Sequence, residues 1–174
     1  MTAPVFVDSN VLLYRRDAAE TVKQPLAAAW LEHLWKSASG RTSCQVLNEF
    51  YVNATRKLSP GLDPEDAWDD VTALFRWNPL PTTTDLIVRS RDIERRHRLS
   101  WWDSLIVAAA QMQNCALLLS EDFQDGARYG SVGVRSPFTL TIREAGAEYA
   151  GSPRISRHPP RGRPRKIGRS EAFR

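Results

Sequence analysis

Two kinds of hydrophobic spacing alternate along the first 150 residues. Short apolar runs, typical of buried strands, lie at residues 4–7, 116–119 and 132–134, and a short extended segment lies at 41–43. Between them, apolar side chains recur every three to four residues, as they do on the buried face of a helix. This spacing predicts helices that include residues 26–38, 47–58, 63–75, 84–97 and 101–114. The alternation predicts an α/β fold in which helices flank a central parallel sheet.

Two of these helices carry more detailed predictions. In the first, Leu26, Trp30, Leu34 and Ala38 recur every four residues and form the predicted buried face. The third is predicted to begin after Asp63, because this residue is a common N-cap and is followed by a proline and two acids.

The composition is that of an ordinary globular domain. Of the 174 residues, 42% are hydrophobic and 25% are charged. The longest apolar stretch, Leu105–Ala110, is far shorter than the roughly 20 residues of a membrane span. The N-terminus lacks the pattern of a signal peptide. The two cysteines have no second Cys or His at metal-binding spacing, and we therefore expect a cytoplasmic protein that does not contact membranes.

Charge is divided unevenly between the body of the chain and its C-terminal end. Residues 151–174 hold eight basic residues and one acidic residue, a net charge of +7, whereas residues 1–150 hold 16 basic and 19 acidic residues, a net charge of −3. The last segment is also rich in proline and glycine and has few apolar residues. We therefore predict a folded domain at 1–145 and a disordered basic tail at 146–174.

Four acids occupy positions that matter for chemistry. Asp8 and Asp122 follow predicted strands, where α/β sheets bind ligands, while Glu49 and Asp103 lie on predicted helices. Each has an ordinary structural explanation: Asp8 as a helix cap, Glu49 as a solvated helix residue, Asp122 as a turn residue, and Asp103 as part of a capping box with Ser100. Together, however, clustered carboxylates are the ligands that a hard cation such as Mg²⁺ prefers, and such cations support phosphodiester hydrolysis.

Missing motifs leave several other enzyme classes without support. The sequence has no glycine-rich phosphate loop after its first strand, no Gly-x-Ser-x-Gly elbow and no His-Glu-x-x-His helix. Nothing positions two of its three histidines as a catalytic pair. A dehalogenase-like phosphotransferase would need a second aspartate two residues after Asp8, and Asn10 stands there.

Four segments of the chain resemble the sequence blocks of PIN-domain nucleases, in the family's order and spacing. They are Val5–Tyr14, Gln45–Tyr51, Ser100–Ala110 and Leu118–Gly126. The last block has the form common among VapC-type toxins. The resemblance covers about residues 4–140 and predicts a PIN-like fold.

The resemblance implies a Mg²⁺-dependent endoribonuclease, with Mn²⁺ able to substitute, that hydrolyses RNA phosphodiesters. It also implies a homodimer and a VapB-type antitoxin partner, as in type II toxin–antitoxin systems. The acids that match the family's catalytic and metal-binding positions are Asp8, Glu49, Asp103 and Asp122. Asn10 and Ser120 match the small polar positions beside them, and Asp125 is a further supporting candidate.

The basic tail has a resemblance of its own. Residues 160–166 are similar to the AT-hook, which binds the minor groove of A/T-rich DNA, and the predicted nucleic-acid-binding residues are Arg161, Gly162, Arg163, Pro164, Arg165 and Lys166. A solvated basic tail is the simpler alternative. The tail also leaves open a DNA-associated regulator with a PIN-like scaffold, or an RNA-processing nuclease without an antitoxin. A small antitoxin gene immediately upstream would favour the toxin.

Overall fold

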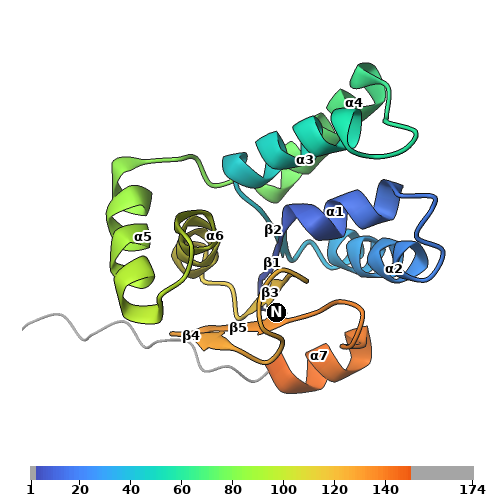
Figure 1. The fold of residues 1–174 in the computed structure, drawn as a ribbon. Helices are drawn as coiled ribbons and strands as arrows, with labels where there is room; N and C mark the ends of the chain where they lie inside the picture. Colours follow the sequence, from blue (N-terminus) through green and yellow to red (C-terminus); the bar gives the residue numbers. More distant parts are fainter. Residues whose placement is uncertain (1–2, 150–174) are drawn as a thin grey trace, which may run out of the picture.

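The computed structural model of the protein describes residues 3–149. A five-stranded sheet with the strand order β2-β1-β3-β5-β4 lies at the centre of the molecule (Figure 1). The strands are β1 (Val5–Val7), β2 (Gly40–Arg41), β3 (Leu117–Leu119), β4 (Arg128–Tyr129) and β5 (Val132–Arg135). The pairs β1–β2, β1–β3 and β3–β5 are parallel, and only the edge strand β4 is antiparallel. The predicted α/β fold with a mostly parallel sheet is confirmed.

Helices cover both faces of the sheet. Residues 3–149 contain α1 (Ser9–Arg16), α2 (Lys23–Lys36), α3 (Cys44–Arg56), α4 (Pro64–Leu74), α5 (Thr84–His97), α6 (Trp101–Met112) and α7 (Ile142–Tyr149). Helix α6 packs on β3 and β5 with α5 outside it, while α1 and α2 lie on the opposite side of the sheet and α3 pairs with α4 (Figure 1). Within these residues, no helix is long and apolar enough to cross a membrane.

The register of the two central strands determines where the chain leaves the sheet. Strands β1 and β3 pair in parallel with Val7 opposite Leu119, and both residues are fully buried. The residues that follow the two strands, Asp8 and Ser120, therefore emerge side by side at the carboxyl edge of the sheet. Ligands bind at this edge in many α/β proteins.

The predicted buried face of the first helix is partly wrong. In α2, Leu26 is 40% exposed, and Ala38 lies beyond the helix with a φ of 53°. The residues that α2 buries are Ala27, Trp30, Leu31 and Leu34. An α-helix turns once every 3.6 residues, so a four-residue repeat drifts by about 40° at each step and leaves the buried face after two steps.

The hydrophobic spacing along the chain does not predict three short elements, α1, β4 and α7. The predicted boundary at residue 145 falls inside α7, whose last residue, Tyr149, is buried. Tyr149 packs closely on Gly133 of β5, where an added Cβ would lie 2.9 Å from the tyrosine hydroxyl oxygen. The folded body thus extends at least to Tyr149.

Candidate active site

Asp8 lies between the end of β1 and the start of α1. It follows β1 directly and serves as the N-cap of α1, where its Oδ1 accepts a 2.7 Å hydrogen bond from the backbone N–H of Ser9. Its other carboxylate oxygen, Oδ2, accepts a 2.7 Å hydrogen bond from the hydroxyl of Ser120. Only 5% of Asp8 is exposed. The capping explanation is therefore correct, but it accounts for only one of the two carboxylate oxygens.

Asn10 and Ser120 connect Asp8 to Asp122. The side-chain amide of Asn10 lies 3.1 Å from Ser120 Oγ and 3.0 Å from Asp122 Oδ2, and 3.4 Å from Asp8 Oδ2. Ser120 Oγ also accepts a hydrogen bond from the backbone N–H of Asp122. The parallel pairing of β1 with β3 makes this network possible, because it places the two loops after the strands next to each other.

Glu49 reaches the same edge from α3. Its Oε2 accepts a 3.0 Å hydrogen bond from the hydroxyl of Ser9, and its Oε1 accepts a 2.9 Å hydrogen bond from the side-chain amide of Gln45. Neither Ser9 nor Gln45 was among the predicted site residues. The helical spacing contained a signal for Gln45, because residues four positions apart lie on one helix face.

Asp103 lies in the first turn of α6. Ser100 is the N-cap of this helix and accepts a hydrogen bond from the backbone N–H of Asp103. Within residues 3–149 the carboxylate of Asp103 accepts no hydrogen bond, so the second half of the predicted capping box is not formed. The neighbouring carbonyl of Trp102 lies 3.5 Å from the Gln45 amide, which also binds Glu49. This contact places the start of α6 beside α3.

Negative charge accumulates at this edge without compensation. The pKa of Asp8 is raised from 3.8 to about 6: burial contributes most, the charges of Asp122 and Glu49 add to it, and hydrogen bonds from Ser120 and Ser9 oppose it. Within residues 3–149, none of the four acids takes part in an ion pair. Uncompensated carboxylates repel one another unless a cation lies between them.

The donor chemistry of the site fits a hard divalent cation. The side chains that converge here are carboxylates, supported by hydroxyl and amide groups, which are the ligands of Mg²⁺ and Mn²⁺. In the described part of the chain, no three His, Cys, Asp or Glu side chains are already close enough together to hold a metal ion. The site therefore provides the ligand types, and the acids on α3 and α6 would have to approach Asp8 to complete a coordination shell.

Comparison with known proteins identifies the family. A family model of the PIN domain matches residues 5–125, which is more than two thirds of the chain. The chain belongs to the PIN-domain family. No curated protein matches it in a sequence comparison.

A solved structure has a similar fold. The Mycobacterium tuberculosis protein VapC20, reported as a sarcin-ricin loop cleaving toxin, superposes with a TM-score of 0.50 at 21% sequence identity. The similarity covers 68% of this chain and 91% of that chain. At this identity, the comparison supports the PIN fold.

Two other acids of the PIN domain, both in the loop after β3, are held by groups outside the acidic cluster. Asp125 accepts hydrogen bonds from the side chains of Arg135 and Thr139 and from the backbone of Ser136, so it organises the turn after β5. Glu121 forms a 2.5 Å ion pair with Lys23. Asp122 is the acid of this loop that lies beside Asn10 and Ser120.

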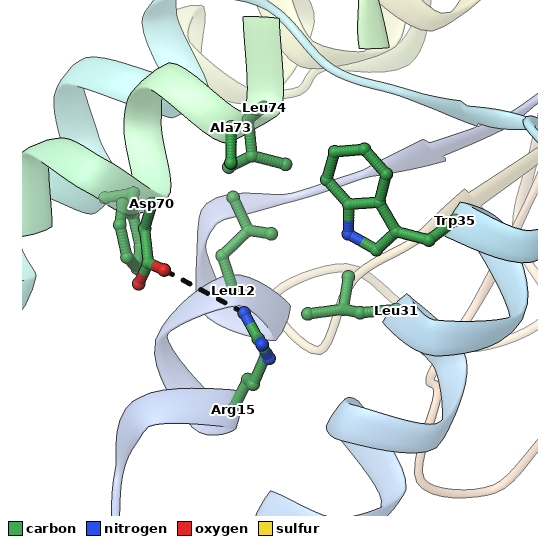
Figure 2. Close-up of a pocket in the computed structure, with 8 residues that line it drawn as sticks. Leu12, Arg15, Leu31, Trp35, Asp70, Ala73 and Leu74 are labelled. Carbon is green, nitrogen blue, oxygen red and sulfur yellow. Dashed lines mark ion pairs between the residues drawn. The ribbon is translucent and has the colours of Figure 1, made fainter. Parts of the chain in front are cut away.

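The PIN domain also has a cavity away from the acids. It has a volume of about 250 Å³ and lies among α1, α2, α3 and α4. Figure 2 shows Leu31 and Trp35 on one side and Asp70 on the other, with the 4.0 Å ion pair between Arg15 and Asp70. None of the four candidate acids lines this cavity. The predicted nucleic-acid-binding residues of the tail, 161–166, lie outside the described residues.

Proposed function

We propose that this PIN domain is a metal-dependent endoribonuclease that hydrolyses RNA phosphodiesters as the toxin of a type II toxin–antitoxin pair. The convergence of Asp8, Asp122 and Glu49 at the carboxyl edge of the sheet, with no basic side chain paired to them within residues 3–149, is the observation that carries the proposal. Membership of the PIN-domain family and the similarity to the fold of VapC20 support it.

We assign metal binding to Asp8, Glu49, Asp103 and Asp122. A bound Mg²⁺ or Mn²⁺ would supply an activated water and would offset the charge that develops on the phosphate. The surrounding side chains orient these acids: Ser120 and Asn10 donate to Asp8 and Asp122. Because the pKa of Asp8 is about 6, this ligand is ionised above that pH.

Activity on RNA tests the proposal directly. A single-stranded RNA should be cleaved in Mg²⁺ or Mn²⁺, leaving a 5′-phosphate and a 3′-hydroxyl, and excess EDTA should stop the reaction. The Asp8→Asn variant should be inactive. Full cleavage in EDTA would contradict the proposal, and products with a 2′,3′-cyclic phosphate would indicate chemistry that does not depend on these acids.

An antitoxin is the expected partner, and a second copy of the chain the expected oligomer. The cavity among α1, α2, α3 and α4 supports a protein partner, because it combines apolar walls with the charged pair of Arg15 and Asp70. The product of a small reading frame immediately upstream should co-purify with the PIN protein and suppress RNA cleavage. Full activity in the presence of that product would favour a nuclease without an antitoxin.

The basic C-terminal segment is proposed to add contacts to nucleic acid. Its net charge of +7 is opposite to that of the body. Truncation after residue 151 should preserve turnover on a short RNA but weaken binding to duplex DNA, with a loss of salt dependence. An A/T-rich duplex should compete better than a G/C-rich duplex, and equal competition would mean that the tail is a generic polycation.

A further inference from the structure

The carboxylate of Glu121, the residue before Asp122, is held by residues from two helices. Lys23, at the start of α2, lies with its Nζ 2.5 Å from Glu121 Oε1 and 3.2 Å from the hydroxyl oxygen of Tyr14. Lys23 and Glu121 are 98 residues apart in the sequence, so only the fold brings them together.

The aromatic rings of Tyr14 and Phe138 restrict the position of the Lys23 ammonium group. Its Nζ lies 4.6 Å from the ring centroid of Tyr14 and 5.3 Å from that of Phe138, and the two rings pack edge to face with centroids 5.1 Å apart. The side chains of Lys23 and Glu121 are 30% and 33% exposed. Exposed ion pairs usually contribute little to stability, because both side chains move. Here the two aromatic rings and the tyrosine hydroxyl define one position for the ammonium group of Lys23.

One face of α1 contacts Glu121 directly through Asn10 and indirectly through Tyr14, which contacts Lys23. Asn10 and Tyr14 are four residues apart and therefore lie on the same side of α1. Asn10 Oδ1 lies 3.4 Å from the backbone nitrogen of Glu121, while its amide nitrogen lies 3.0 Å from Asp122 Oδ2. Glu121 is thus held through its backbone and its side chain, directly before the acid that faces the cluster.

We propose that Lys23 and Tyr14 are positioning residues, which clamp Glu121 so that the loop after β3 keeps Asp122 at the metal site. The role for the metal rests on the proposed function, whereas the restraint on the loop does not. The clamp also gives the two adjacent acids, Glu121 and Asp122, different roles. Glu121 is neutralised by Lys23, whereas Asp122 forms no ion pair with any other residue in the described range 3–149.

Hydrogen exchange of the metal-free protein tests the restraint. In Lys23→Met, which removes the charge but keeps an aliphatic stem, backbone amides in residues 117–126 should exchange about tenfold faster, since a loop that loses its anchors opens more often. The matched control is Lys36→Met: Lys36 is on the same helix, and its Nζ is also 2.5 Å from a glutamate, Glu32, but that pair is far more exposed. The control should exchange like the unaltered protein.

Mn²⁺ binding, measured by electron paramagnetic resonance without RNA, tests the consequence for the site. The dissociation constant should rise about tenfold in Lys23→Met, the lower end of the range for residues that orient metal ligands. Lys23→Arg should restore most of the affinity, and Tyr14→Phe, which keeps the ring, should have a smaller effect. The control Lys36→Met should bind Mn²⁺ normally.

The outcomes separate this proposal from the proposed function. Unchanged exchange in Lys23→Met would overturn the clamp, and faster exchange with unchanged Mn²⁺ affinity would overturn its role in positioning Asp122. If the unaltered protein binds no Mn²⁺ through Asp8, the proposed function fails and the positioning role fails with it. The metal-free exchange data would still show whether Lys23 restrains the loop.

Discussion

The two halves of the acidic site are built differently. Asp8 and Asp122, which follow β1 and β3, belong to one hydrogen-bonded network through Asn10 and Ser120. Glu49 and Asp103 come from two separate helices. Exposure does not divide the pairs, because Asp122 is exposed whereas Glu49 and Asp103 are half-buried. We call the first pair the strand half and the second pair the helix half.

The difference reflects how each half is held. Adjacent parallel strands place the residues that follow them within hydrogen-bond distance, because the ladder of hydrogen bonds sets their register. The acids of the helix half stand on separate helices whose contact at the site is the long hydrogen bond from Gln45 to the Trp102 carbonyl. We therefore expect the strand half to be preorganised and the helix half to move when a cation binds.

The largest expected effect is loss of activity when either half loses an acid. Asp8→Asn and Asp103→Asn should each lower the cleavage rate at least about 100-fold, more than the loss of a residue that merely orients a ligand. Asp69→Asn, an exposed acid on α4, is the control and should keep its rate. If Asp103 mattered only for the start of α6, Asp103→Asn would remain active.

A cation should join the two halves and stabilise the fold. At a Mn²⁺ concentration 100 times the dissociation constant, the free energy of unfolding should rise by about 2.7 kcal/mol, because the ion binds only the folded state. Thermal unfolding with Mn²⁺ or EDTA measures this change. Asp8→Asn should show little of it, and equal stabilisation of this variant would place the cation elsewhere.

The buried carboxylate of the strand half should also make stability depend on pH. Since the pKa of Asp8 is raised from 3.8 to about 6, the metal-free folded state holds this proton more tightly than the unfolded chain. The resulting stability is complete below about pH 4 and is lost as the pH rises to about 6. Relative to the unaltered protein, Asp8→Asn should gain about 2 kcal/mol between pH 4 and pH 7, somewhat less than the full shift implies because Asp8 of the unfolded chain is already partly ionised at pH 4.

Denaturant unfolding at pH 4 and pH 7 in EDTA measures that gain. The control Asp69→Asn should show no such change, because its carboxylate is exposed. A constant difference between Asp8→Asn and the unaltered protein across this range would mean that Asp8 is not the group responsible.

The smallest expected changes in cleavage rate come from replacing the residues that support the acids of each half. Ser120→Ala removes a 2.7 Å hydrogen bond from buried Asp8 and should lower the cleavage rate about tenfold. Gln45→Ala removes weaker contacts to a half-buried acid and should have a smaller effect. Rates measured over a series of Mg²⁺ concentrations test the comparison, and a larger effect of Gln45→Ala would reverse our assignment of the preorganised half.

Local signals in the sequence were sufficient for much of the fold, while the choice of acids remains a prediction. The predicted bounds of α5 are those observed, because a threonine cap and a basic last turn mark its two ends. The N-cap Asp63 was predicted because it is a common capping residue that is followed by a proline and two acids. Elements such as α1 and α7, with eight residues each, are too short for a helical repeat to mark them.

The sequence by itself determined which residues are candidates for the chemistry, since strand ends, caps and family blocks are features of neighbouring positions. The tertiary structure decided how those residues are held. Burial of Asp8 depends on helices packed from several parts of the chain, and its raised pKa follows from that burial and from the nearby charges of Asp122 and Glu49. The pairing of Glu121 with Lys23 likewise joins the loop after β3 to the distant start of α2. No local pattern encodes such contacts, because they arise only when the sheet and helices assemble.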